Sequence, residues 1–234
     1  MDLIGQGLVE ALRLLVSGDP ELVRISTLSL VVSISAALIA ALIGIPTGVV
    51  LALARFPGRG VINVLVNTGM GLPPVLVGLC ISVLLWRSGP LGFLQLLYTP
   101  AAMVIAQFVV AVPIVIGLTR AAVGVLNPEL AESLRVCGAR NHQVAYQLIR
   151  AAHRPVAVAV VAGFGRAIGE VGASLMVGGS ILGQTRILTT AITLETSRGD
   201  FALAIALGGV LLVLALLVNM IVSVGAHRTI ANAG

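Results

Sequence analysis

The chain has no lysine, few charged residues and few aromatic ones, and these shortages exclude whole classes of protein. Charged residues make up 10% of the 234 residues and aromatic residues 3%, whereas 58% are hydrophobic. Soluble domains carry roughly 25% charged residues, so a soluble fold is excluded. The mean hydropathy of +1.11 indicates an integral membrane protein. With 27 glycines and so few aromatic residues, its helices are expected to pack closely through small side chains.

All 14 basic residues are arginine. Without lysine the chain cannot contain the G-x-x-x-x-G-K-[ST] loop that cradles nucleotide phosphates, so it is not expected to hydrolyse ATP itself. Cys80 and Cys137 lie in segments of opposite polarity and are not expected to form a disulfide. No metal or cofactor site is predicted, because His and Cys do not recur at ligand spacing. An intramembrane enzyme built on Ser174 would lack a base, since the histidines lie in polar segments.

Long apolar stretches occupy most of the sequence, and each can cross a bilayer, for which about 20 residues suffice. The chain is therefore predicted to be an all-α integral membrane protein with about five transmembrane helices. Proline is expected to bend the first near Pro46, and the adjacent Pro73 and Pro74 are expected to break the second. The spans are predicted at residues 25–54, 61–86, 100–123, 155–177 and 201–224.

Residues 1–24 are predicted to precede a transmembrane domain that covers residues 25–234. Apolar residues at helical spacing over 3–16 favour an amphipathic helix that lies in the membrane interface or faces a partner. Asp19 as a capping residue and Pro20 at the first helical position predict the start of a helix just before the first span. Near the other end of the chain, residues 178–200 are interpreted as a glycine-rich outer connection.

The longest polar run, residues 127–154, must face water. A helix that Asn127 caps is predicted over 128–137, followed by a left-handed turn at Gly138 and a second helix that Asn141 caps. The predicted structure is a helical hairpin that projects from the membrane. On spacing alone, it could equally be a simple connection between two spans.

Arginine is unevenly divided between the two sides of this topology. The side of the N-terminus has five: Arg13, Arg24, Arg87, Arg186 and Arg198. The side of the polar run has nine: Arg55, Arg59, Arg120, Arg135, Arg140, Arg150, Arg154, Arg166 and Arg228. Since arginine accumulates in cytoplasmic loops, the polar run and the C-terminus are predicted to be cytoplasmic and the N-terminus to lie outside.

The polar run also resembles a known motif of the permease subunits of ABC importers. That motif is Glu-Ala-Ala, followed by three residues and then a glycine. The residues that carry the resemblance are Glu132, Ser133, Leu134, Gly138 and Ala139. The spacing from acid to glycine matches, whereas the two alanines are replaced. The Leu-Pro pair that the family often has further along is replaced by Arg150 and Ala151.

Three further runs extend the resemblance over most of the chain: GIPTGVVLALARF at residues 44–56, GLPPVLVG at 71–78 and GRAIGEVGA at 165–173. All three are similar to runs of molybdate, tungstate and sulfate permeases, and residues 177–201 look most like the tungstate branch. The resemblance implies the type I ABC importer permease architecture in the inner membrane of a bacterial or archaeal cell. It implies an oxyanion substrate, tungstate first, with molybdate or sulfate as the alternatives.

In that family the polar loop is a coupling helix that docks on a cytoplasmic ATPase subunit, which uses ATP and Mg²⁺. An extracytoplasmic binding protein delivers the anion. The resemblance implies that the coupling residues are Glu129, Glu132, Ser133, Leu134, Arg135, Gly138, Ala139 and Arg140. Residues expected either to contact the binding protein or to form a plain solvated rim are Gln184, Thr185, Arg186, Glu195, Arg198 and Asp200. Five spans do not readily enclose a path, so a homodimer with the path on its twofold axis is expected.

Arg166 and Glu170 lie four residues apart, on one face of the fourth span. Charges inside a membrane suggest function by default. The two could line or gate the path together with Pro73 and Pro74, or form an ion pair that holds the span to its neighbours. Pairing would weaken the hold of the arginine on a passing anion, which must be released. A gradient-driven secondary transporter or channel is the alternative of a different class.

Overall fold

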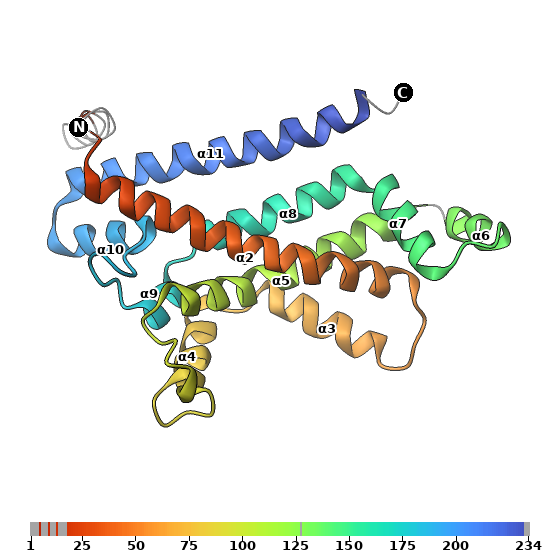
Figure 1. Cartoon of the computed structure of the whole chain (residues 1–234), viewed down its shortest axis with the longest axis horizontal. Coiled ribbons are helices and arrows are strands. Elements are labelled where there is room, and N and C mark those ends of the chain that lie inside the picture. Colours follow the sequence, from red (N-terminus) through yellow and green to blue (C-terminus); the bar gives the residue numbers. More distant parts are fainter. Residues whose placement is uncertain (1–4, 6–8, 10–12, 14–17, 127, 232–234) are drawn as a thin grey trace.

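The computed structural model describes the chain except residues 1–4, 6–8, 10–12, 14–17, 127 and 232–234. This described part consists of helices and their connections, with no strand in it, which confirms the predicted all-α fold. Figure 1 shows the long helices running along one direction, with α6 at one end of the molecule and α10 at the other. The amphipathic helix predicted over 3–16 lies largely outside the described residues.

Helix α2 (Pro20–Leu53) and helix α5 (Pro100–Gly124) pack along each other at the centre of the molecule. The start of α2 is as predicted, because the Asp19 carboxylate accepts a hydrogen bond from the Leu22 amide at 2.8 Å. Pro46 lies inside α2 without interrupting it. The close approach to α5 depends on Gly48, where an added Cβ would lie 2.8 Å from the carbonyl oxygen of Ile116.

The second span is broken where the sequence predicts. Helix α3 (Arg59–Met70) ends before Gly71, and helix α4 (Pro74–Leu85) begins at the second of two adjacent prolines, neither of which has an N–H to continue a helix. The two helices are bent by 104°. Helix α4 therefore turns away from the long helices (Figure 1), and a 3₁₀ turn, η1 (Gly92–Leu94), leads back to α5.

Helices α6 (Pro128–Val136) and α7 (Asn141–Ala151) form the predicted hairpin at one end of the molecule (Figure 1). Helix α8 (His153–Ile168) follows α7 at a bend of 80°. The helix thus restarts two residues before Pro155, which is tolerated there because the first N–H groups of a helix have no internal acceptor.

The rest of the chain differs from its prediction in two places. The single helix expected over 155–177 is wrong, because α8 ends at Ile168 and α9 (Gly172–Gly178) starts again after a break at 169–171. The outer connection is not a plain loop, because it contains α10 (Leu188–Arg198). Helix α11 (Phe201–Ala231) completes the fold.

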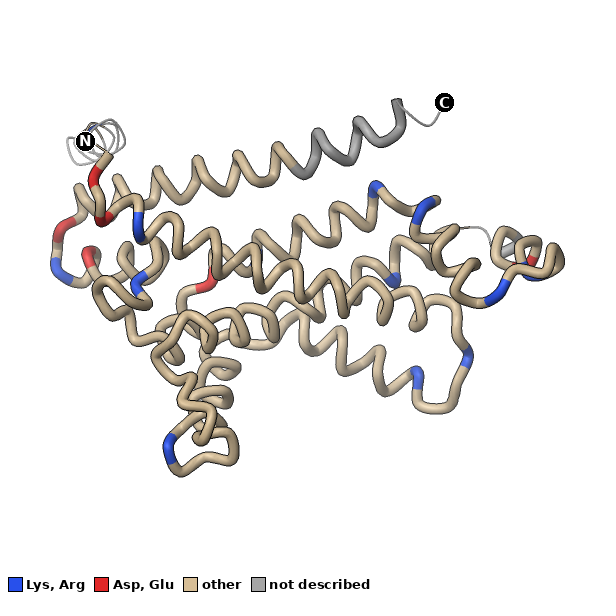
Figure 2. Tube along the Cα trace, in the orientation of Figure 1, with Lys and Arg blue, Asp and Glu red and all other residues tan. Residues whose placement is uncertain are grey.

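Within the described residues, α2, α5 and α11 are long and apolar enough to cross a membrane. The bent pairs α3–α4 and α7–α8 raise the number of spans to at most five. Figure 2 shows that most charged residues lie near the two ends of the long helices. The end formed by α6 and α7 carries mostly basic residues, and acidic residues are more frequent at the end near α10.

Candidate functional site

The turn between α6 and α7 has the left-handed geometry that the sequence predicts. Gly138 has a φ of +82°, and its amide donates to the Arg135 carbonyl at 2.9 Å while the Ala139 amide donates to Leu134 at 3.0 Å. An added Cβ at Gly138 would meet nothing within 4 Å. Glycine is therefore favoured here by the backbone conformation and not by close packing.

The start of α7 differs by one residue from its prediction. Asn141 is already helical, so Arg140 occupies the capping position in place of Asn141. The Gln143 side chain reaches back and accepts a hydrogen bond from the Arg140 amide at 2.7 Å. A glutamine at the third helical position can satisfy this amide, which explains why the asparagine is not needed as a cap.

The hairpin has an apolar underside that fastens it to the membrane helices. One buried cluster joins the ends of α2 and α5 to the hairpin and the start of α8; its members are Val49, Val123, Ala131, Val144, Leu148, Ala152 and Val156. Leu134 and Ala139 are half-buried and pack against this cluster. A force applied to the hairpin is thus transmitted to both central helices, since packed interiors deform little.

The opposite surface of the hairpin is open. Glu132, Ser133, Arg135 and Arg140 are exposed there, whereas the side chain of Glu129 lies outside the described residues. Two exposed side chains are absent from the sequence prediction, Val136 at 87% exposure and Tyr146 at 62%. Neither residue belongs to the family motif, so the resemblance does not predict a role for them. What marks them in the sequence is that they are apolar residues on helices that face water.

A second group of predicted residues lies at the break between α8 and α9. Glu170 is 2% exposed, and its carboxylate accepts a hydrogen bond from the Ala173 amide at 2.9 Å. The Arg166 guanidinium, whose side chain is 34% exposed, lies 3.5 Å from the same carboxylate. Thr189 of α10 donates to the Glu170 carbonyl at 3.0 Å. Glu170 therefore caps α9 as well as facing Arg166.

The two broken spans meet at their second halves, α4 and α9. An added Cβ at Gly172 would lie 2.6 Å from Val75, and one at Gly78 would lie 2.7 Å from the Cα atom of Ala173. The Ser82 hydroxyl donates to the Met176 carbonyl at 3.1 Å. The structure thus brings the break at Pro73 and Pro74 next to the break that contains Glu170.

Both breaks leave backbone carbonyls without a donor in the described part of the chain. At the first they belong to Met70, Gly71 and Leu72, and at the second to Ile168 and Gly169. Backbone of this kind is tolerated at membrane depth only where water or protein covers it. The junction of the two breaks is accordingly the candidate for a hydrated path.

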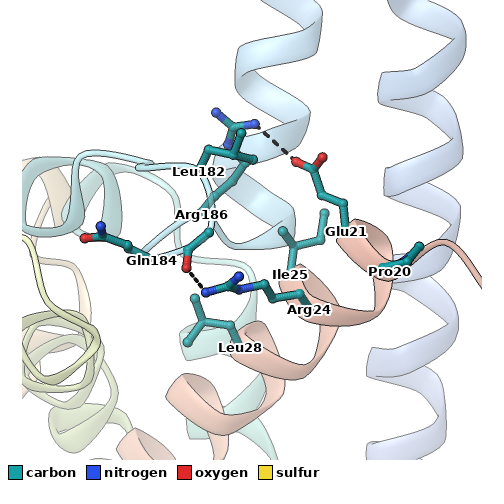
Figure 3. Close-up of a pocket in the computed structure, with 9 residues that line it drawn as sticks. Pro20, Glu21, Arg24, Ile25, Leu28, Leu182, Gln184 and Arg186 are labelled. Atoms are coloured by element: carbon teal, nitrogen blue, oxygen red, sulfur yellow. Dashed lines mark hydrogen bonds and ion pairs between the residues drawn. The ribbon is translucent and has the colours of Figure 1, made fainter.

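At the end of the molecule near α10, two contacts join the first turns of α2 to the loop after α9, and we call this pair of contacts the clasp. Arg24 donates to the carbonyl of Gly183, and Arg186 pairs with Glu21 at 3.4 Å. Figure 3 shows the two guanidinium groups pointing in different directions, each to its own partner. The cavity between these segments has a volume of about 270 Å³. Arg24 and Arg186 therefore each supply one of the two contacts that join these segments.

The predicted outer contact residues are placed unequally. Gln184, Arg198 and Asp200 are exposed, and Asp200 also accepts from the Leu203 amide at the start of α11. Thr185 is fully buried, where its hydroxyl donates to the Gly178 carbonyl and accepts from the Ile181 amide. Glu195 is buried and pairs with Arg198 at 2.9 Å. In this structure the Thr185 hydroxyl therefore links residues of its own chain and is not available on the surface.

A bundle with two adjoining helix breaks and a polar hairpin fastened to its central helices is the arrangement expected of a membrane transport subunit. The chain belongs to the family described as the binding-protein-dependent transport system inner membrane component, whose model matches residues 44–230. The resemblance to permeases of ABC importers is thereby confirmed. This membership favours a binding-protein-dependent system over the gradient-driven transporter or channel.

Among its relatives is the tungstate uptake system permease protein TupB of Peptoclostridium acidaminophilum, 40% identical over 222 residues, which are 95% of this chain and 97% of the relative. A probable anion ABC transporter permease protein of Haloferax volcanii is 39% identical over 85% of this chain and 88% of its own length. TupB of Campylobacter jejuni is 34% identical over 94% of this chain and 92% of its own length.

Proposed function

We propose that this chain is the membrane-spanning subunit of an ABC importer for tungstate. The observation that carries the proposal is 40% identity over 95% of the chain to a tungstate uptake permease. Relatives named as sulfate and molybdenum permeases are less similar, at 26% and 28% identity. Tungstate, molybdate and sulfate are tetrahedral dianions, so the same path chemistry would serve all three.

A separate cytoplasmic ATPase drives transport and docks on the hairpin of α6 and α7. The hairpin supports this role, since its outer surface is exposed while its underside is fastened to α2 and α5. ATP and Mg²⁺ are used by that partner, because this chain has no lysine for a phosphate loop. The hairpin and the C-terminus then lie in the cytoplasm, and the N-terminus lies outside the inner membrane.

An extracytoplasmic binding protein delivers the anion at the opposite end, near α10. The exposed side chains available there are Gln184, Arg198 and Asp200. A second copy of the chain completes the path, whose lining includes the two breaks with Pro73, Pro74, Arg166 and Glu170. Because Glu170 offsets the charge of Arg166, a dianion that reaches the junction is not held there.

The test is uptake of radiolabelled tungstate into proteoliposomes that contain this chain, its ATPase and its binding protein. Uptake is expected to require ATP and the binding protein, and to be inhibited far less by a tenfold excess of molybdate or sulfate than by unlabelled tungstate. Equal inhibition by the three anions would reject tungstate and leave an oxyanion importer. Uptake without ATP would reject the importer class.

A further inference from the structure

Helix α4 presents an uncharged, apolar face that nothing in the described residues covers. Val75, Leu76, Leu79 and Val83 are exposed on it, while Val77, Gly78 and Ile81 face the rest of the chain. Because α4 is bent by 104° from α3, it turns across the direction of the long helices (Figure 1).

The segment that leads into α4 cannot be covered by lipid. Met70, Gly71 and Leu72 have carbonyls with no donor among the described residues, and Gly71 is exposed. Helix α3 runs for 12 residues from Arg59 to this break, which at 1.5 Å per residue lies about 18 Å from the basic end. A hydrocarbon core is about 30 Å thick, so the break is at membrane depth, where lipid offers no hydrogen-bond donor.

A groove of about 700 Å³ lies along the exposed side of α4, between α4 and α9. Its walls include Leu79, Val83 and Met176, and polar Ser82 and Ser88 also line it. The Ser82 hydroxyl already donates to the Met176 carbonyl, whereas the exposed Ser88 offers a hydroxyl that a protein surface can pair with and lipid tails cannot.

We propose that the outward face of α4, with the groove beside it, is the surface on which a second copy of this chain packs. The proposal rests on the proposed homodimer and adds which surface forms the seam. A face without charges is suited to itself, because a twofold interface brings the same patch from both copies together and no like charges would meet. The partner also closes the open side of the break, so the hydrated junction is incomplete in a single copy.

The experiment compares two tryptophan substitutions at exposed leucines. Leu79→Trp places a bulky apolar side chain on α4, and Leu212→Trp places the same side chain on α11, where Leu212 is 61% exposed. Lipid accommodates either change, whereas a packed seam is overfilled. The dissociation constant of the Leu79→Trp dimer is expected to be at least about tenfold higher than that of wild type. Light scattering of the protein in detergent over a range of concentrations measures it. Leu212→Trp and the volume-conserving Leu79→Met should match wild type.

A second measurement uses the native cysteine on this face and does not depend on a substitution in α4. Cys80 and Cys137 are both exposed in a single copy. In a Cys137→Ser background, Cys80 should react with a membrane-permeant maleimide at least about tenfold more slowly in the dimer than in the monomer, since a packed seam excludes the reagent. Cys137 in a Cys80→Ser background should show no such difference.

The outcomes separate this proposal from the proposed function. The seam would be overturned if wild type is a dimer, Leu79→Trp dimerises as tightly as wild type, and Cys80 reacts with maleimide equally fast in dimer and monomer. The outward face of α4 would then face lipid. Weakening by Leu212→Trp alone would move the seam to α11. A wild-type chain that transports as a monomer would overturn the homodimer itself, and the seam with it.

Discussion

The Gln107 side chain of α5 donates a hydrogen bond to the Ser174 hydroxyl of α9 at 3.1 Å, and both side chains are completely buried. This bond is a polar contact between a central helix and the half-helix that follows the second break. The other amide atom, Gln107 Oε1, has no partner among the described residues. This hydrogen bond between α9 and α5 lies within an apolar cluster that includes Met103, Ala106 and Ala173.

Ser174→Ala should destabilise the protein more than Gln107→Leu does. The alanine leaves a buried amide with no partner at all, which costs about 1–3 kcal/mol, whereas leucine leaves only the smaller Ser174 hydroxyl without its partner. Thermal unfolding in detergent is the measurement. The double variant should be close to Gln107→Leu, and strictly additive losses would contradict a direct bond between the two side chains.

Glu170→Gln and Glu170→Ala should separate the cap of α9 from the charge of the carboxylate. Glutamine can still accept from the Ala173 amide, so its free energy of unfolding should remain near wild type, while alanine should lose about 1 kcal/mol. Glutamine leaves Arg166 without a nearby counter-charge, so it should slow transport by holding the dianion. Coupled uptake and thermal unfolding are both measured, and a glutamine variant with wild-type uptake would remove Glu170 from the path.

Gly138→Val should uncouple ATP hydrolysis from uptake or prevent the ATPase from docking. With φ at +82°, a β-branched residue is strained by about 1–2 kcal/mol although the surrounding space is open. Gly138→Asn is the matched control, since asparagine tolerates the left-handed conformation. The ratio of tungstate imported to ATP hydrolysed should fall for valine and stay near wild type for asparagine. A valine variant with normal coupling would make the hairpin a simple connection.

Val136→Glu should weaken binding of the ATPase, because a charge replaces an apolar side chain that is exposed on the proposed docking surface. Val136 is 87% exposed on α6, and Val125, just after α5, is 88% exposed, so Val125→Glu is a control of equal exposure outside the hairpin. Co-purification of the ATPase with each variant is the measurement. A loss of about tenfold or more in affinity is expected for Val136→Glu alone. Equal losses for both would indicate a general charge effect.

Residue chemistry made some features predictable and left others hidden. Adjacent prolines remove two amide donors wherever they occur, so the break before α4 follows from the sequence alone. The break before α9 contains no proline: Thr189 and the Ala173 amide hold Glu170 in place, and both contacts depend on how α9 and α10 fold back. Tertiary contacts of this kind leave no local signal, so the span was expected to continue.

The same distinction applies to the candidate site. Gly138 was identifiable because a glycine between two capped helices predicts a left-handed turn, and the structure has one. The burial of Thr185 cannot be predicted from the sequence. A threonine in a glycine-rich stretch gives no indication that its hydroxyl bonds to both Gly178 and Ile181. Helix α10 was missed because threonine and isoleucine are weak helix formers, and its burial against α11 and α2 decides the outcome.

The clasp between α2 and the loop after α9 has a consequence for biogenesis. Its two contacts join residues 159 and 165 positions apart, Arg24 with Gly183 and Glu21 with Arg186. Chains are made from the N-terminus, so α2 is synthesised before either of its partners in the clasp. The first turns of α2 can be fastened in this way only after the segment that follows α9 has been made. A nascent chain that stalls before that point therefore leaves Glu21 and Arg24 without these two partners.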